Sequence, residues 1–187
     1  MASPSKHLGY VIMEAVDGTY RGAVLVTDFR GIPADFRYTD PITPSRVEKI
    51  LYGSSLEAYL REELILGSLT GAVELQPLLW IGEDEGIPEP LARITKTRSI
   101  LLGPTNRPPF DKVGMWEKQN EPGSCIFQAD PLSAPLRLSI AGGEGRDEDM
   151  KNTVALLVDA ASTMDILEPF SRMGKVLSAI AEEKDGN

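Results

Sequence analysis

The sequence predicts an α+β fold in which a sheet begins with a three-stranded antiparallel meander and helices pack on its faces. Three observations lead to this prediction. Residues 20–66 indicate a hairpin that runs directly into a helix, and the apolar run at 78–81 has the length of a buried strand. Residues 154–180 repeat apolar side chains at helical spacing, which predicts a C-terminal helical segment.

The meander rests on turn chemistry as well as on alternation. Its strands are expected at 10–16, 22–27 and 32–38. Asp17 and Gly18 make the first turn, and the segment from Asp28 to Gly31 makes the second. Pro33 cannot donate a ladder hydrogen bond, so the third strand is expected at an edge of the sheet.

A helix, or two helical segments, should follow at 44–66. Thr43 is expected as its N-cap with Pro44 in the first turn, where the missing N–H costs nothing. Gly53 can end the first segment, and a capping-box pattern at 54–57 starts the second. The first segment carries an apolar stripe made of Val47, Ile50 and Leu51.

The second half of the chain is harder to interpret. Residues 87–135 are rich in proline and predict an irregular excursion, in which the convincing apolar runs are 100–102 and 125–127. A strand at 136–140 follows, and then two helical segments that Pro169 divides.

A chain of 187 residues is expected to form one domain. We place this domain at 9–183, between a disordered leader at 1–8 and a tail at 184–187. Cys125 is the only cysteine, which excludes an intramolecular disulfide and favours a reducing compartment. No apolar run approaches the roughly 20 residues that span a bilayer, so a cytoplasmic protein without a membrane partner is expected.

Charge and motifs exclude several functions. The formal net charge of −9 and pI near 4.7 argue against nucleic acid as a partner, because phosphate binding requires clustered Lys and Arg. The only histidine, His7, lies in the leader, so a nucleophile with a histidine base is not expected. The glycine-rich stretch 142–145 precedes a helix, but Glu144 within it would repel phosphate, and we interpret it as a loop.

One arrangement of acidic residues indicates chemistry. The order of elements through residue 84 resembles the ribonuclease H-like fold, in which carboxylates on the first strand, the helix and the fourth strand hold divalent metals. This resemblance implies a metal-dependent nuclease or phosphodiesterase that uses Mg²⁺ or Mn²⁺. The implied ligands, which are also the implied catalytic residues, are Glu14 or Asp17, Glu62 or Glu63, and Asp84. Of these we select Asp17, Glu63 and Asp84.

Two apolar features suggest interfaces. Trp116 lies between two proline clusters and is expected either in a satellite core or as an anchor for a partner. Near the C-terminus the spacing of three, four and three residues is that of a coiled-coil seam, with packing on the protein's own sheet as the other interpretation. The seam residues are Phe170, Met173, Leu177 and Ile180.

No set of residues converges on a catalytic motif, and this observation determines the functional prediction. We expect a non-catalytic interaction or regulatory subunit of a cytosolic assembly, self-associating as a homo-oligomer and without a cofactor. The alternative is the metal-dependent nuclease of ribonuclease H-like organisation. A small-molecule sensor with a pocket between the sheet and the irregular region is a second alternative.

Overall fold

The computed structural model describes residues 6–143 and 146–185. The strands are β1 (His7–Val16), β2 (Thr19–Asp28), β3 (Pro33–Tyr38), β4 (Leu79–Gly82), β5 (Ser99–Pro104), β6 (Trp116–Lys118), β7 (Ser124–Phe127) and β8 (Leu136–Ile140). The helices are α1 (Arg46–Tyr52), α2 (Leu56–Ala58), α3 (Ser68–Ala72), α4 (Pro88–Thr95), α5 (Asp147–Ala161) and α6 (Glu168–Asp185), with the 3-10 turn η1 (Gly53–Ser55) and the π-helix η2 (Tyr59–Gly67).

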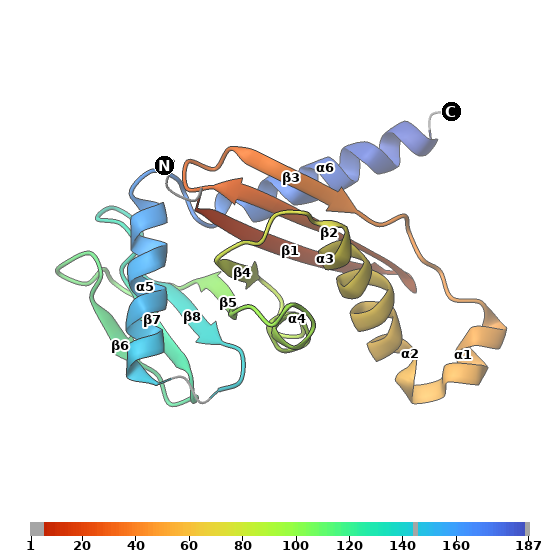
Figure 1. The fold of residues 1–187 in the computed structure, drawn as a ribbon, viewed down its shortest axis with the longest axis horizontal. Helices are drawn as coiled ribbons and strands as arrows, with labels where there is room; N and C mark the ends of the chain where they lie inside the picture. Colours follow the sequence, from red (N-terminus) through yellow and green to blue (C-terminus); the bar gives the residue numbers. More distant parts are fainter. Residues whose placement is uncertain (1–5, 144–145, 186–187) are drawn as a thin grey trace.

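The strands form one eight-stranded mixed sheet in the order β3-β2-β1-β4-β5-β8-β7-β6 (Figure 1). The α+β class, the opening meander and the C-terminal helical segment are therefore confirmed. β3 lies at an edge, as Pro33 indicates, and Gly31 closes the turn before it with φ of 78°. Asp28 fixes that turn because its carboxylate accepts the amides of Arg30 and Ile32.

Parallel pairing joins the meander to the second half of the chain. β1 and β5 both run parallel to β4, with Leu8 opposite Leu79 and Val11 opposite Gly82. The carboxyl ends of β1, β4 and β5 therefore meet at the same edge of the sheet. In open sheets this is the edge where ligands bind.

The proline-rich segment 87–135 is more regular than the sequence indicates, because α4, β5, β6 and β7 all lie within it. α4 has proline at its first position, Pro88, which is a recognised start signal. The apolar runs at 100–102 and 125–127 belong to β5 and β7, where Cys125 is fully buried. At the N-terminus, β1 already begins at His7, inside the expected leader.

The helical region after the meander is also built differently from the expectation. The N-cap of α1 is Ser45, which forms a capping box with Glu48, rather than Thr43. Gly53 ends α1 with φ of 53°, as expected. From Tyr59 the chain continues as the π-helix η2, a winding that a pattern of helical spacing does not reveal.

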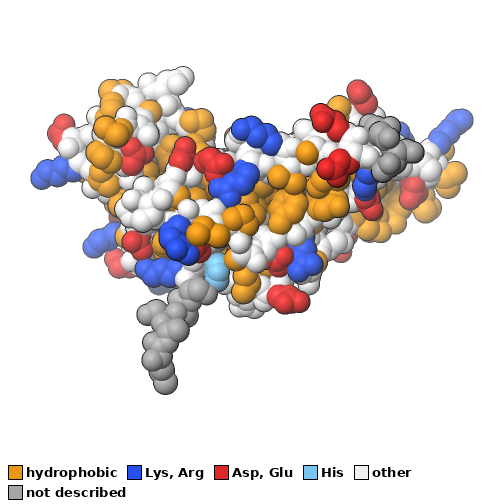
Figure 2. Space-filling model, turned by 90° about the horizontal axis from the view of Figure 1, so that it is seen from above, with side chains coloured by type: hydrophobic (Ala, Val, Ile, Leu, Met, Phe, Trp, Pro, Cys, Tyr) orange, Lys and Arg blue, Asp and Glu red, His pale blue; other side chains and the backbone are white. Residues whose placement is uncertain are grey.

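Two hydrophobic cores lie on opposite faces of the sheet. The larger one joins the even-numbered side chains of β1, such as Leu8 and Tyr10, to α5 and α6. The smaller one joins Val11, Val24 and Trp80 to η2, α3 and α4. The charged side chains are interspersed on the outer surface, and Figure 2 shows no large region of one sign on the face it presents.

The apolar seam near the C-terminus belongs to the larger core. Phe170, Met173 and Leu177 are between 0 and 7 % exposed and pack on the sheet, while Ile180 is half-buried. Trp116 is half-buried against the same core. Packing on the protein's own sheet, the other interpretation of the seam, describes Phe170, Met173 and Leu177, and the assignment of all five residues to an interface stays a prediction.

Within the described ranges, no helix has the length and apolar character needed to cross a bilayer.

Candidate functional site

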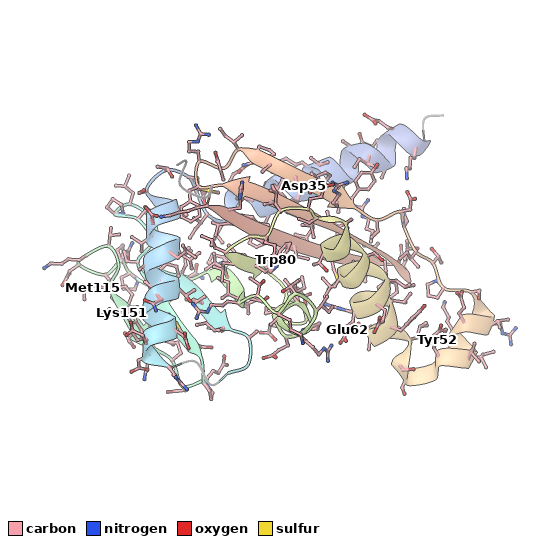
Figure 3. All side chains as sticks on the ribbon, in the orientation of Figure 1. Asp35, Tyr52, Glu62, Trp80, Met115 and Lys151 are labelled. Atoms are coloured by element: carbon pink, nitrogen blue, oxygen red, sulfur yellow. The ribbon has the colours of Figure 1, made fainter. Side chains whose placement is uncertain are left out.

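The carboxyl end of β4 leads into α4, which packs against η2, and acidic side chains lie around this edge of the sheet. Glu14 lies on β1, Glu62 lies on η2, and Glu83 and Asp84 follow β4 directly. Figure 3 shows Glu62 on the helical segment that runs beside α4. We call this set of residues the acidic edge.

Asp84 is held by its own surroundings. The Arg61 guanidinium lies 3.0 Å from its carboxylate, and the Gly86 amide donates to the same oxygen at 2.7 Å. Arg61 also reaches Glu57 at 3.6 Å, one helical turn away. Asp84 therefore closes the turn after β4 and anchors it to the helical region.

Two further residues of the acidic edge, Glu62 and Glu14, also pair with arginines. Glu62 forms an ion pair with Arg93 of α4. Glu14 pairs with Arg21 at 2.6 Å, its partner directly across the β1–β2 ladder. Arg21 also donates to the Leu177 carbonyl oxygen at 3.1 Å, which ties α6 to the meander.

Glu83 points to the face of the sheet that α6 covers. Together with Phe170 and Ser171 it lines an open cavity of about 480 Å³ at the start of α6. Burial raises the pKa of Glu83, and the neighbouring carboxylates of Asp84 and Glu14 raise it further. Within the described chain, Glu83 makes no ion pair.

The structure does not gather the three carboxylates selected from the sequence. Asp17 lies in the exposed β1–β2 turn with φ of 51°. It is six residues beyond Val11, which is about 20 Å along the strand at ~3.3 Å per residue. Glu63 is exposed on η2, whereas Asp84 is at the acidic edge.

The donor set does not fit the divalent metal that the ribonuclease H-like resemblance implies. Among residues 6–143 and 146–185, no three His, Cys, Asp or Glu side chains lie close enough to hold a metal ion. The last paired residues of the β1–β4 ladder are Val11 and Gly82, which offer no side-chain oxygen. A Cβ on Gly82 would lie 2.9 Å from Ile87, so this position is filled by apolar packing.

The arginines are the residues that sequence reasoning missed. The pair of Arg61 with Glu57 has the i, i+4 spacing of a helical ion pair and could have been found. The pairs of Arg21 and Arg93 depend on strand register and on the packing of α4 against η2. No sequence pattern carries that information.

The glycine-rich stretch 142–145 gives no phosphate site in the described residues. The Gly142 amide donates to the Glu89 carboxylate at 2.5 Å, so an acid of the same chain already accepts it. Residues 144 and 145 lie outside the described ranges. A second open groove of about 480 Å³ lies between the 130–134 loop and the α5–α6 connection, in the region proposed for a sensor pocket.

Comparison with known proteins gives a clear result for the fold. No protein-family model matches the sequence, and no curated protein matches it. Endonuclease V from Bacillus subtilis has a similar structure, with a TM-score of 0.61 and 13% identity over 98% of this chain and 84% of that chain. Endonuclease V from Streptomyces avermitilis gives 0.60 and 14% over 97% and 83%.

A third structure is Endonuclease V from Ciona intestinalis in complex with DNA that contains an inosine followed by a ribo-adenosine. It gives a TM-score of 0.58 and 13% identity over 97% of this chain and 88% of that chain. Across nearly its whole length, the chain therefore has the fold of these nuclease structures.

This likeness corrects three predictions. The non-catalytic interaction or regulatory subunit and the self-associating homo-oligomer are not supported, because the structural neighbours are endonucleases. The exclusion of nucleic acid as a partner is wrong in the same way, since one neighbour is bound to DNA. The finding favours the nuclease-like alternative.

Proposed function

We propose that this protein acts on nucleic acid and binds it at the acidic edge, with the exposed Arg93 of α4 as the first contact. The observation that carries the proposal is the fold, which matches a DNA-bound endonuclease V over 97% of the chain. The edge formed by the carboxyl ends of parallel strands is the general ligand-binding edge of such sheets.

The charge of the chain requires that its phosphate contacts be local. Arg93 has 62 % of its side chain exposed, although it pairs with Glu62. Each phosphate that such a cation neutralises releases counterions, which makes binding dependent on salt.

Fluorescence anisotropy tests this proposal with labelled single-stranded and double-stranded oligonucleotides, with and without inosine. The Arg93→Gln variant is expected to bind more weakly than the wild type. Its plot of log affinity against log salt should be shallower by about one unit for each lost phosphate contact. Lys151→Gln is the matched control, because Lys151 is an exposed cation on α5, away from Glu62 (Figure 3).

Two outcomes would refute the proposal. One is the absence of binding to every oligonucleotide at low salt. The other is an equal loss of affinity in the Lys151→Gln control, which would mean that binding follows total charge rather than this site.

A cytoplasmic location is proposed with this function, consistent with a single buried cysteine that forms no disulfide.

A further inference from the structure

We propose that this chain binds nucleic acid without a divalent metal ion, because the end of the β1–β4 pair offers no side-chain oxygen and arginine side chains already pair with the carboxylates around it. The inference rests on the proposed function, since it describes how the same site handles a polyanion. Three observations on different elements carry it.

The first observation is the apolar floor of the edge. Val11 and Gly82 are opposite one another at the end of the β1–β4 pair, and Ile87 packs on them. All three are buried. Hard cations such as Mg²⁺ require oxygen ligands, and β1 supplies none until Glu14, about 10 Å beyond Val11 at ~3.3 Å per residue.

The second observation is that a separate guanidinium is already bound to each of three carboxylates. The pairs are Glu14 with Arg21, Glu62 with Arg93, and Asp84 with Arg61. A metal ion would have to displace these arginines, which are always charged and bind carboxylates through several N–H donors. Only Glu83 is left without an ion pair in the described residues, and one carboxylate is a weak site.

The third observation is that the arginines differ in exposure. Arg61 is half-buried, with 23 % of its side chain exposed, and it pairs with two exposed acids, Glu57 and Asp84. Arg93 is exposed and can turn toward solvent. The edge therefore contains a half-buried cation that neutralises its acids and an exposed cation that can meet phosphate.

The test measures metal and nucleic acid separately. In the free wild-type protein, millimolar Mn²⁺ or Mg²⁺ should leave the melting temperature unchanged and give no heat in a calorimetric titration. Affinity for the oligonucleotide that binds best should be the same in EDTA as in Mn²⁺. Metal-dependent tightening, or cleavage of the oligonucleotide that Asp84→Asn abolishes, would overturn the inference.

A variant makes the test sharper. Replacing Arg61 and Arg93 by Met removes the cations that pair with Asp84 and Glu62, so the affinity of the double variant for nucleic acid in EDTA should fall. Mn²⁺ should still leave its melting temperature unchanged, because the described residues contain no cluster of three metal-ligating side chains. Arg30→Met is the matched control, because it removes an arginine from an ion pair with Asp28 at the β2–β3 turn. A variant that folds and binds nucleic acid with wild-type affinity would contradict the role given to the arginines.

The two proposals fail separately. If no oligonucleotide binds, the proposed function is wrong, and the metal titration of the free protein still decides whether the edge holds a cation. If the double variant does not fold, the wild-type titration alone is decisive.

Discussion

The helices α1 and α6 carry the same kind of apolar stripe, but the stripe of α1 is exposed and that of α6 is buried. Val47, Ile50 and Leu51 of α1 are 72, 73 and 77 % exposed. The corresponding stripe of α6 is buried on the sheet. Figure 1 shows the cause: α6 runs along the meander, whereas α1 lies at the end of a long connection, away from the sheet.

Apolar periodicity predicts a helix and the face of that helix that could be buried, but it does not predict which element of the fold covers that face. The apolar residues of α6 have β1 and β2 beneath them. No residue of α1 is buried, and its capping box at Ser45 and Glu48 stabilises it locally instead.

The largest expected effect is the loss of stability when an apolar side chain of the α6 stripe is truncated. Leu177→Ala should lower the free energy of unfolding by roughly 2–5 kcal/mol, because it opens a cavity under α6. Ile50→Ala, the matched change on α1, should cost roughly 0.5 kcal/mol or less. Urea unfolding of both variants measures this difference, and equal losses would mean that α1 is covered in solution.

Besides apolar packing, a hydrogen bond from Arg21 to the Leu177 carbonyl oxygen joins α6 to the meander. Arg21→Met removes the bond to the Leu177 carbonyl and leaves the half-buried Glu14 unpaired. The expected loss is roughly 1–3 kcal/mol. Arg37→Met breaks a pair with Asp35 on the edge strand β3, and roughly 0.2–1 kcal/mol is expected there by the same unfolding assay.

Tyr10→Phe should act in the opposite direction. The Tyr10 hydroxyl is buried beneath α6, and no described residue is its hydrogen-bond partner. The ring packs edge-on against Phe170 at 5.4 Å, and phenylalanine keeps that contact. A gain of about 1 kcal/mol is expected, with Tyr38→Phe on the exposed β3 surface as the control. A destabilised Tyr10→Phe protein would show that the hydroxyl has a partner.

The smallest effect concerns Glu83, beside the first turn of α6. Its raised pKa means that the folded state binds the proton more tightly than the unfolded state. Stability should therefore fall as pH rises from the ordinary carboxyl range through the raised pKa, and remain lower above it. Glu83→Gln should remove this component of the pH dependence, which thermal melts at a series of pH values would detect. An unchanged profile would count against it.

Much of the fold follows from local patterns. Residue types and their alternation predict the turns at 17–18 and 28–31 and the edge position of Pro33. They also predict the buried strand β4. α4 was missed although Pro88 marks its start, because eight residues between proline-rich stretches give little periodicity. β5 and β7 are short buried strands, which cannot be distinguished from other apolar runs by period.

The site is less visible in the sequence because it depends on register. Asp84 follows a recognisable strand, so its place after β4 could be predicted, but the pairing of Val11 with Gly82 depends on tertiary structure. Asp17 was selected for the first-strand position that the ribonuclease H-like resemblance implies, and the long β1 strand carries it past the edge. Opposite charges far apart in sequence, such as Glu62 and Arg93, meet only once the helices pack.

Cys125 gives the molecule an internal reporter of opening. Its thiol lies on β7 in the larger core, and burial raises its pKa to about 12. The thiolate is the form that reacts with a thiol reagent. In the native protein at neutral pH the reaction is slow for two reasons, because the thiol is buried and because it is protonated. Because the chain has one cysteine, the labelling rate measures the opening of a single strand without any engineered probe.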